Sequence, residues 1–333
     1  MASEALATRP EQPHAPYFDE SRARRRLVLG LGALWVLDAI LQMQPGMFTM
    51  DMISTIMQPA ASGNPTWLAE LIHWSIRLVT PHLVPFNWSI VAVQLAIGLT
   101  LLSGHRVLVR TGLWASLAFG LLVWVFGEGL GQLLTGSATL LTGAPGSAFF
   151  YAVSAALLLL PAGRWTHHRG RSDAATWSVG LAFVLAAAFQ FSPVFWTGLG
   201  LEAPFGAAYM MPQPHVLRAA VDAAASLASA APLVFNTTLI VLFLGLGVLV
   251  VQRPRSGAVF WTALTLIAAV WVFGQDAGML WSGMATDPNS APLLALLLWS
   301  GHAGWRDGEG RARAGGVTVT PADERRAATR SST

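Results

Sequence analysis

The strongest constraint on this sequence is a series of apolar runs long enough to cross a lipid bilayer. About 20 apolar helical residues span the hydrocarbon core, which is roughly 30 Å thick. Only 11% of the residues are charged, whereas a soluble domain carries about 25%, so lipid must surround much of the chain. We predict an all-α, polytopic membrane protein of about eight transmembrane helices. The apolar runs, the last of them shorter than a full span, begin near Leu27, Ser89, Leu113, Ser147, Thr176, Pro232, Val259 and Ala291.

The basic residues indicate how these helices are oriented. Threading eight spans from a cytoplasmic N-terminus leaves only Arg77 and Arg218 on the outer side, and the positive-inside rule favours that topology. The sequence therefore predicts a multi-pass protein of the bacterial cytoplasmic (inner) membrane with both termini inside. Because the arginines fall in short clusters between apolar runs, they indicate topology and no nucleic-acid partner. The arginines of the cytoplasmic loops are Arg106, Arg110, Arg164, Arg169, Arg171, Arg253, Arg255, Arg306, Arg311 and Arg313.

The two halves of the chain carry an internal repeat. The run from Val123 to Glu128 recurs as the run from Val270 to Gln275, and shorter blocks match in the same order on both sides. An even number of spans in each unit makes the two repeats parallel. We predict a first four-helix unit at 23–165 and a second at 173–306, with disordered cytoplasmic segments at 1–22 and 307–333. The shorter blocks pair Gln42–Pro45 with Gln190–Pro193, Pro85–Asn87 with Val234–Asn236, Thr135–Thr139 with Ser282–Thr286, and Pro145–Ala148 with Pro288–Ala291.

Each unit is predicted to hold a long external segment after its first helix, at 45–87 and at 193–232. The stretch from Trp67 to Trp74, with Arg77 after it, is too polar to span a bilayer and too apolar for water. His215 to Ala231 is the counterpart in the second unit. Amphipathic helices of this kind lie on a membrane surface or cap a bundle. A second interpretation is that they dock an extracytoplasmic protein partner.

Carboxyl groups in apolar runs are the first candidates for a functional site, because an unpaired charge at membrane depth is costly. Asp38, Glu128 and Asp276 all belong to the outer half of the predicted membrane region, at the same depth as several amides. We expect them to line an outward-facing polar pocket. The alternative is that these side chains bond backbone groups where glycines let helices approach closely. The other expected pocket residues are the amides Gln42 and Gln275, the aromatic walls Trp35, Trp124 and Trp271, and the counter-ions Arg77 and Arg218.

Methionine, histidine and cysteine bear on possible cofactors. Met47, Met50, Met52 and Met57 crowd behind the first apolar run, and thioethers can hold Cu(I), although methionines more often serve as adaptable packing. With Met43, most of them would share one face of a continuous helix. The histidines fall outside the predicted spans, which argues against haem b. The chain has no cysteine, which excludes disulfide exchange and cysteine-ligated Fe–S clusters.

The glycine-rich run Trp124–Val125–Phe126–Gly127–Glu128–Gly129, together with a four-helix unit whose long external segment follows the first helix, resembles the DoxX-like family of bacterial membrane proteins. That resemblance implies quinone-associated redox chemistry in the membrane. This chain departs from the family by fusing two units and by lacking the cysteines of its thiol-handling relatives. The function expected from the resemblance is binding of a quinone or lipid-like ligand. The sequence leaves two alternatives open, a transporter or copper-handling protein and a non-catalytic scaffold.

Overall fold

The computed structural model describes residues 22–161, 165, 173–206 and 212–315. Every regular element within these ranges is helical, so the predicted all-α class is confirmed. Four stretches are long and apolar enough to cross a membrane: Thr66–Leu102, Arg106–Phe126, Pro232–Gln252 and Gly257–Gly274. The apolar helices Ser147–Leu159 and Ala174–Phe189 are shorter.

The first half of the bundle consists of α1 (Arg22–Leu41), α4 (Leu83–Leu102), α5 (Arg106–Phe126) and α6 (Ser147–Leu159). Helix α1 packs closely on α4, and α5 packs on α6. Glycines make the first of these contacts possible, because a Cβ atom at Gly98 would lie 2.9 Å from the carbonyl oxygen of Gly32. Close backbone approach of this kind is the usual basis of helix association in lipid.

The second half consists of α7 (Ala174–Phe189), α11 (Pro232–Gln252), α12 (Gly257–Ala269) with its π-helical continuation η10 (Val270–Gly274), and α13 (Ser290–Gly315). Helices α7 and α11 also meet at glycines, since a Cβ atom at Gly180 would lie 2.9 Å from the carbonyl oxygen of Gly247. Helix α13 contacts α1, α6 and α7 and so joins the halves. It continues to Gly315, beyond the predicted unit boundary at 306.

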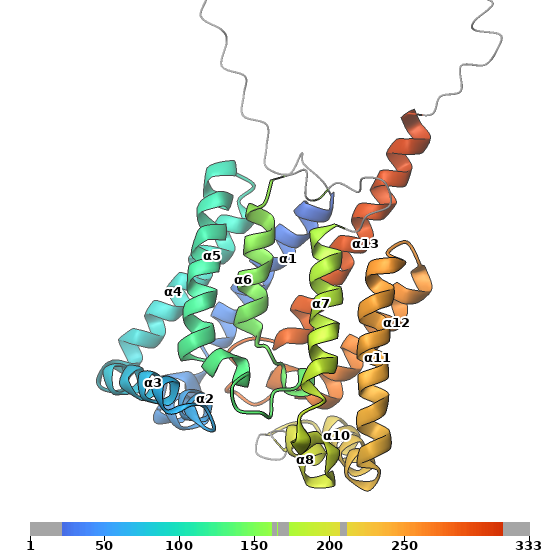
Figure 1. Ribbon diagram of the computed structural model, residues 1–333. Coiled ribbons are helices and arrows are strands. Elements are labelled where there is room, and N and C mark those ends of the chain that lie inside the picture. Colours follow the sequence, from blue (N-terminus) through green and yellow to red (C-terminus); the bar gives the residue numbers. More distant parts are fainter. Residues whose placement is uncertain (1–21, 162–164, 166–172, 207–211, 316–333) are drawn as a thin grey trace, which may run out of the picture.

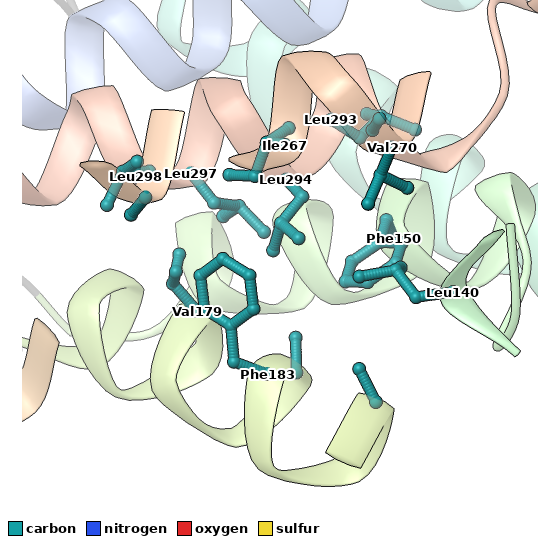
Figure 2. Close-up of a cluster of buried hydrophobic side chains, with 14 of the residues drawn as sticks. Leu140, Phe150, Val179, Phe183, Ile267, Val270, Leu293, Leu294, Leu297 and Leu298 are labelled. Atoms are coloured by element: carbon teal, nitrogen blue, oxygen red, sulfur yellow. The ribbon is translucent and has the colours of Figure 1, made fainter. Parts of the chain in front are cut away.

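The shared core lies where α13 meets α7 and α6. Figure 2 shows Leu294 and Leu297 of α13 beside Phe183 of α7, with Phe150 of α6 nearby. All four side chains are buried. In apolar surroundings, close packing of such side chains, and not their removal from water, favours helix association.

Four helices lie at one end of the bundle: α2 (Gln58–Ala61), α3 (Thr66–Val79), α8 (Gly198–Glu202) and α10 (His215–Ala230). We call it the α3–α10 end. The start of α1 and the end of α13 lie at the opposite, terminal end (Figure 1). Helix α3 buries Leu68 and Ile72 but exposes Trp67 and Trp74, which agrees with the predicted amphipathic character. The remaining short 3₁₀ or π elements are η2 (Pro45–Phe48), η3 (Met52–Met57), η4 (Thr80–His82), η6 (Leu140–Thr142), η8 (Pro193–Trp196) and η9 (Ala203–Phe205).

Two unusual left-handed turns follow α5 and η10. All four residues of η5 (Gly129–Gln132) have positive φ angles between 54° and 62°, and all four of η11 (Asp276–Met279) lie between 49° and 70°. An L-residue loses roughly 1–2 kcal/mol in this conformation, so the surrounding structure must hold each turn. At Gly131 only glycine fits, because a Cβ atom would collide with the carbonyl oxygen of Pro145. Each turn sends the chain back toward the next bundle helix.

Candidate functional site

A cavity of about 310 Å³ lies among α1, α4, α5 and α6 and is the best candidate for a functional site. Its walls are mostly apolar and aromatic. No lysine, arginine or histidine is among the residues that line it. The polar lining residues are Asp38, Gln42, Ser89, Gln94, Glu128, Ser147, Tyr151, Thr286 and Asp287.

Asp38 is located in the last turn of α1 and is 1% exposed. Its Oδ1 atom has no hydrogen-bond partner within the described part of the chain, and the same holds for the hydroxyl of buried Tyr151 on α6. The Asp38 carboxyl and the Tyr151 hydroxyl lie close enough for a weak hydrogen-bonding interaction, although no hydrogen bond of normal geometry joins them. Trp35, one turn earlier on α1, stacks 4.2 Å from the Tyr151 ring and donates its Nε1–H to Ser116 Oγ at 2.9 Å. The site therefore offers unpaired polar atoms on rigidly packed helices.

Glu128 connects the end of α5 to the start of α6. Its Oε1 atom accepts hydrogen bonds from Ser147 Oγ at 2.6 Å and from the Ala148 amide at 3.0 Å, so this oxygen caps α6. Its Oε2 atom is buried without a partner in the described structure. Burial, and secondarily the negative charge of Asp287, raise the pKa of Glu128 to about 8, although the bonds from Ser147 and Ala148 act in the opposite direction. Glu128 is therefore mainly protonated at neutral pH.

A second cavity of about 230 Å³, which we call the vestibule, adjoins the first near the two left-handed turns. The two cavities share Ile56, Glu128, Ser147, Thr286 and Asp287. Asp287 precedes α13 and is held in place by its own segment: Oδ1 accepts from the Asn289 amide at 2.7 Å and Oδ2 from Thr286 Oγ1 at 2.9 Å. A residue of the second half therefore contributes to a cavity of the first half.

The side of the cavity between α4 and α5 is thin. Val93 of α4 and Leu122 of α5 line the cavity. Both are also exposed on the surface of the bundle, Val93 by 40% and Leu122 by 54%. Side chains that line the cavity on one side are therefore exposed on the bundle surface on the other. We call this side the α4–α5 face.

The structure brings together some of the predicted site residues of the first half. Asp38, Gln42 and Glu128 line the same cavity, with Trp35 as an aromatic wall. The side-chain amide of Gln42 is hydrogen-bonded to Asn87, whose own Nδ2 donates to the Gln42 carbonyl at 3.0 Å. The Gln42 and Asn87 side chains thus bond each other and the backbone, as the alternative interpretation of the amides expects. Trp124, the second expected aromatic wall, does not line the cavity and donates to the Pro145 carbonyl at 2.7 Å.

The predicted residues of the second half do not line this cavity. Trp271 donates to the Pro288 carbonyl at 2.8 Å. Gln275 donates to the Leu140 carbonyl at 3.0 Å and to Ser290 Oγ at 2.9 Å, and it accepts from the Ala291 amide at 3.1 Å. Asp276 is part of the η11 turn, and desolvation raises its pKa to about 6. Trp271 and Gln275 therefore support the local backbone, whereas the Oδ1 atom of Asp276 is buried without a hydrogen-bond partner in the described structure.

The two arginines expected as counter-ions, Arg77 on α3 and Arg218 on α10, are exposed and line neither the cavity nor the vestibule. The cavity carboxyls instead face one another. Sequence reasoning also missed Tyr151, Gln94 and Asp287. One signal for Tyr151 was present, since it is one of three tyrosines in the sequence and stands within an apolar run. Asp287 lies between the last two predicted spans, where no periodicity indicates which way a side chain faces.

The methionines do not converge on one point. The expectation of a continuous helix through Met43, Met47, Met50 and Met57 is wrong, because this segment is divided between η2 and η3. Met47 is fully buried and Met50 is 54% exposed, whereas Met52 and Met57 line the cavity. The segment therefore contributes packing and part of the cavity wall.

Comparison with known proteins identifies no relative of this chain. No family model matches it, and no curated protein or solved structure matches it.

Proposed function

We propose that this chain is a multi-spanning protein of the bacterial cytoplasmic membrane, built from two parallel four-helix units, that binds the head group of a quinone in the cavity of its first unit. The proposal also includes two expectations from the sequence: eight membrane spans and a relationship to the DoxX-like family. The observation that carries it is a cavity with unpaired polar groups that meets the lipid-facing surface between α4 and α5.

Matched hydrogen bonds support the internal repeat. Trp124 donates to the carbonyl of Pro145, and Trp271 donates in the same way to that of Pro288. The Asn87 amide donates to the Gln42 carbonyl at 3.0 Å, and Asn236 donates to the Gln190 carbonyl at 3.0 Å. The two left-handed turns stand at equivalent places. Similar composition of two apolar segments would not by itself reproduce these specific bonds.

The repeat separates residues that hold the fold from residues that line the cavity. Gln42, Asn87, Trp124 and Ser147 have identical counterparts in the second unit. Four other polar groups of the cavity lining have no such counterpart: Asp38 aligns with Ala186, Glu128 with Gln275, Tyr151 with Leu294 and Gln94 with Phe243. Buried Phe183, Phe243 and Leu294 fill the equivalent region of the second unit (Figure 2 labels two of them). The unit therefore forms without these polar groups, which supports a binding role for them in the first unit.

The chemistry of the cavity suits a quinone. Its carbonyl oxygens accept hydrogen bonds, and a protonated Glu128 and the Tyr151 hydroxyl can donate them. The hydroxyls of the reduced form can donate to Asp38 and to the unpartnered Oε1 of Gln94. A volume of about 310 Å³ is at the lower end for ligand sites and suits one ring. An apolar tail would leave across the α4–α5 face into lipid.

Quinone binding can be tested with two adjacent leucines of α5. Leu121 and Leu122 are both exposed on the bundle surface, but only Leu122 lines the cavity. We expect Leu122→Trp to weaken binding of a radiolabelled short-tailed quinone to protein in nanodiscs by about tenfold or more. The larger indole would occupy cavity space at the α4–α5 face, where the quinone tail would leave. Leu121→Trp should bind like the wild type. Equal affinity in both variants, or binding that never saturates, would argue against this site.

The topology predicts which positions a membrane-impermeant thiol reagent can reach. The chain has no cysteine, so an introduced cysteine is the one residue of the protein that the thiol reagent can label. We expect Ser62→Cys and Ser137→Cys, at the α3–α10 end, to react in intact spheroplasts. Ser103→Cys and Gly257→Cys, at the ends of α4 and α12 nearest the arginine clusters, should react only after permeabilisation. The reverse pattern would overturn the orientation, and labelling of all four positions in intact cells would overturn the membrane assignment.

A further inference from the structure

The cavity and the vestibule meet at two carboxyl groups. Glu128 and Asp287 line both spaces. Glu128 uses Oε1 to cap α6 and leaves Oε2 buried without a partner among the described residues. Farther inside, Asp38 likewise leaves Oδ1 unpaired. Two carboxyl groups thus lie where the vestibule meets the cavity, and a third lines the cavity alone.

Titratable groups line the cavity from several elements, and all of those among its lining residues are acids. They are Asp38 from α1, Glu128 after α5, Tyr151 from α6 and Asp287 before α13, while α4 contributes the neutral amide Gln94. The three carboxyls interact electrostatically with one another. Acids grouped in a low-dielectric site without a basic partner cannot all ionise together.

We propose that Asp287, Glu128 and Asp38 form a proton route between the vestibule and the ligand cavity. In the inward direction, protonated Glu128 gives the proton on Oε2 to the carboxylate of Asp38, and Asp287 then gives its proton to the vacated Oε2 of Glu128. Each transfer breaks one O–H bond and forms another, and Asp287 is reprotonated from water in the vestibule. Proton conduction does not depend on the ligand, whereas its use in exchanging protons with a quinone rests on the proposed function.

Asp287 is the best position for a test because its replacement can spare the fold. Asparagine keeps the Oδ1 that accepts the Asn289 amide at 2.7 Å but has no titratable proton. Asp51→Asn, at an exposed position that lines neither cavity, is the matched control. Asp287→Glu restores an acid at the same place. Time-resolved infrared spectroscopy after a pH jump follows the band of protonated carboxyls in the full-length protein in nanodiscs.

We expect Asp287→Asn to slow the carboxyl response about tenfold or more, while Asp287→Glu and Asp51→Asn respond like the wild type. An unchanged rate in Asp287→Asn would overturn the route. Quinone binding measured at constant pH separates the two proposals. A slowed response together with no saturable quinone binding in the wild type would support the route and contradict the proposed ligand. An unchanged response in Asp287→Asn, together with saturable quinone binding in the wild type, would contradict the route and support the proposed ligand.

Discussion

Replacement of Asp38 by alanine is expected to weaken quinone binding by about 10- to 100-fold while the free energy of unfolding stays constant or increases. The reason is the unpaired Oδ1 of this buried carboxyl, which lines the cavity and has no protein partner in the described structure. Losing a hydrogen bond to a buried polar group costs about 1–3 kcal/mol of binding free energy. Removing a buried group that has no hydrogen-bond partner causes no comparable loss in the free energy of unfolding of the ligand-free protein. The equivalent position of the second unit, Ala186, already carries alanine and is buried.

The reciprocal substitution provides the control. Ala186→Asp places a carboxyl in the filled second unit, where Phe183 and Phe243 occupy the surrounding space. We expect it to lower the free energy of unfolding by about 3 kcal/mol or more, because it buries an unpaired acid without a cavity. Quinone affinity and chemical unfolding of both variants in the same detergent measure the two effects. If Asp38→Ala instead destabilised the protein by several kcal/mol and retained its affinity for quinone, Asp38 would be a structural residue.

Replacement of Glu128 by glutamine is expected to reduce the pH dependence of stability above about pH 6. Burial raises the pKa of Glu128 from 4.5 to about 8, so the native state holds a proton that the unfolded chain has released. Protonated Glu128 contributes fully to the free energy of unfolding below pH 4.5, the pKa of this residue in the unfolded chain. The contribution is lost as the pH rises through about 8, the pKa in the native state. Over this range the wild type should lose up to a few kcal/mol. Gln275 shows that an amide can take the capping role, since it accepts from Ala291.

Thermal unfolding midpoints measured from about pH 5 to pH 9 test this expectation. The wild type should lose stability up to about pH 8, as Glu128 ionises. In Glu128→Gln the loss of stability between about pH 6 and pH 8 should be smaller than in the wild type, while the contribution of Asp276 remains, because desolvation raises the pKa of Asp276 to about 6. Asp276→Asn is the matched control and should leave the upper part of the curve unchanged. Identical curves for the wild type and Glu128→Gln would mean that the Glu128 carboxyl is solvated in the native protein.

Much of the architecture could be anticipated from local pattern. Apolar runs with few charges predict helices, and the amphipathic stretch after Trp67 predicts a helix such as α3. Two of the carboxyls that line the cavity, Asp38 and Glu128, stand out in the sequence because charge is rare in apolar runs. The left-handed η5 and η11 were not anticipated, since Leu130 and Ala277 give no local reason for positive φ.

The sequence by itself determined the helical class, the alternation of apolar and arginine-bearing segments, and the placement of two acids within apolar surroundings, because each depends on the properties of neighbouring residues. Only the tertiary structure decided which polar groups have partners. It shows Gln275 fully engaged with Leu140, Ser290 and Ala291, and it brings Asp287 from the second half to the cavity of the first. The reason is physical: whether a buried polar atom is satisfied depends on atoms far away in sequence, which only packing brings within hydrogen-bonding distance.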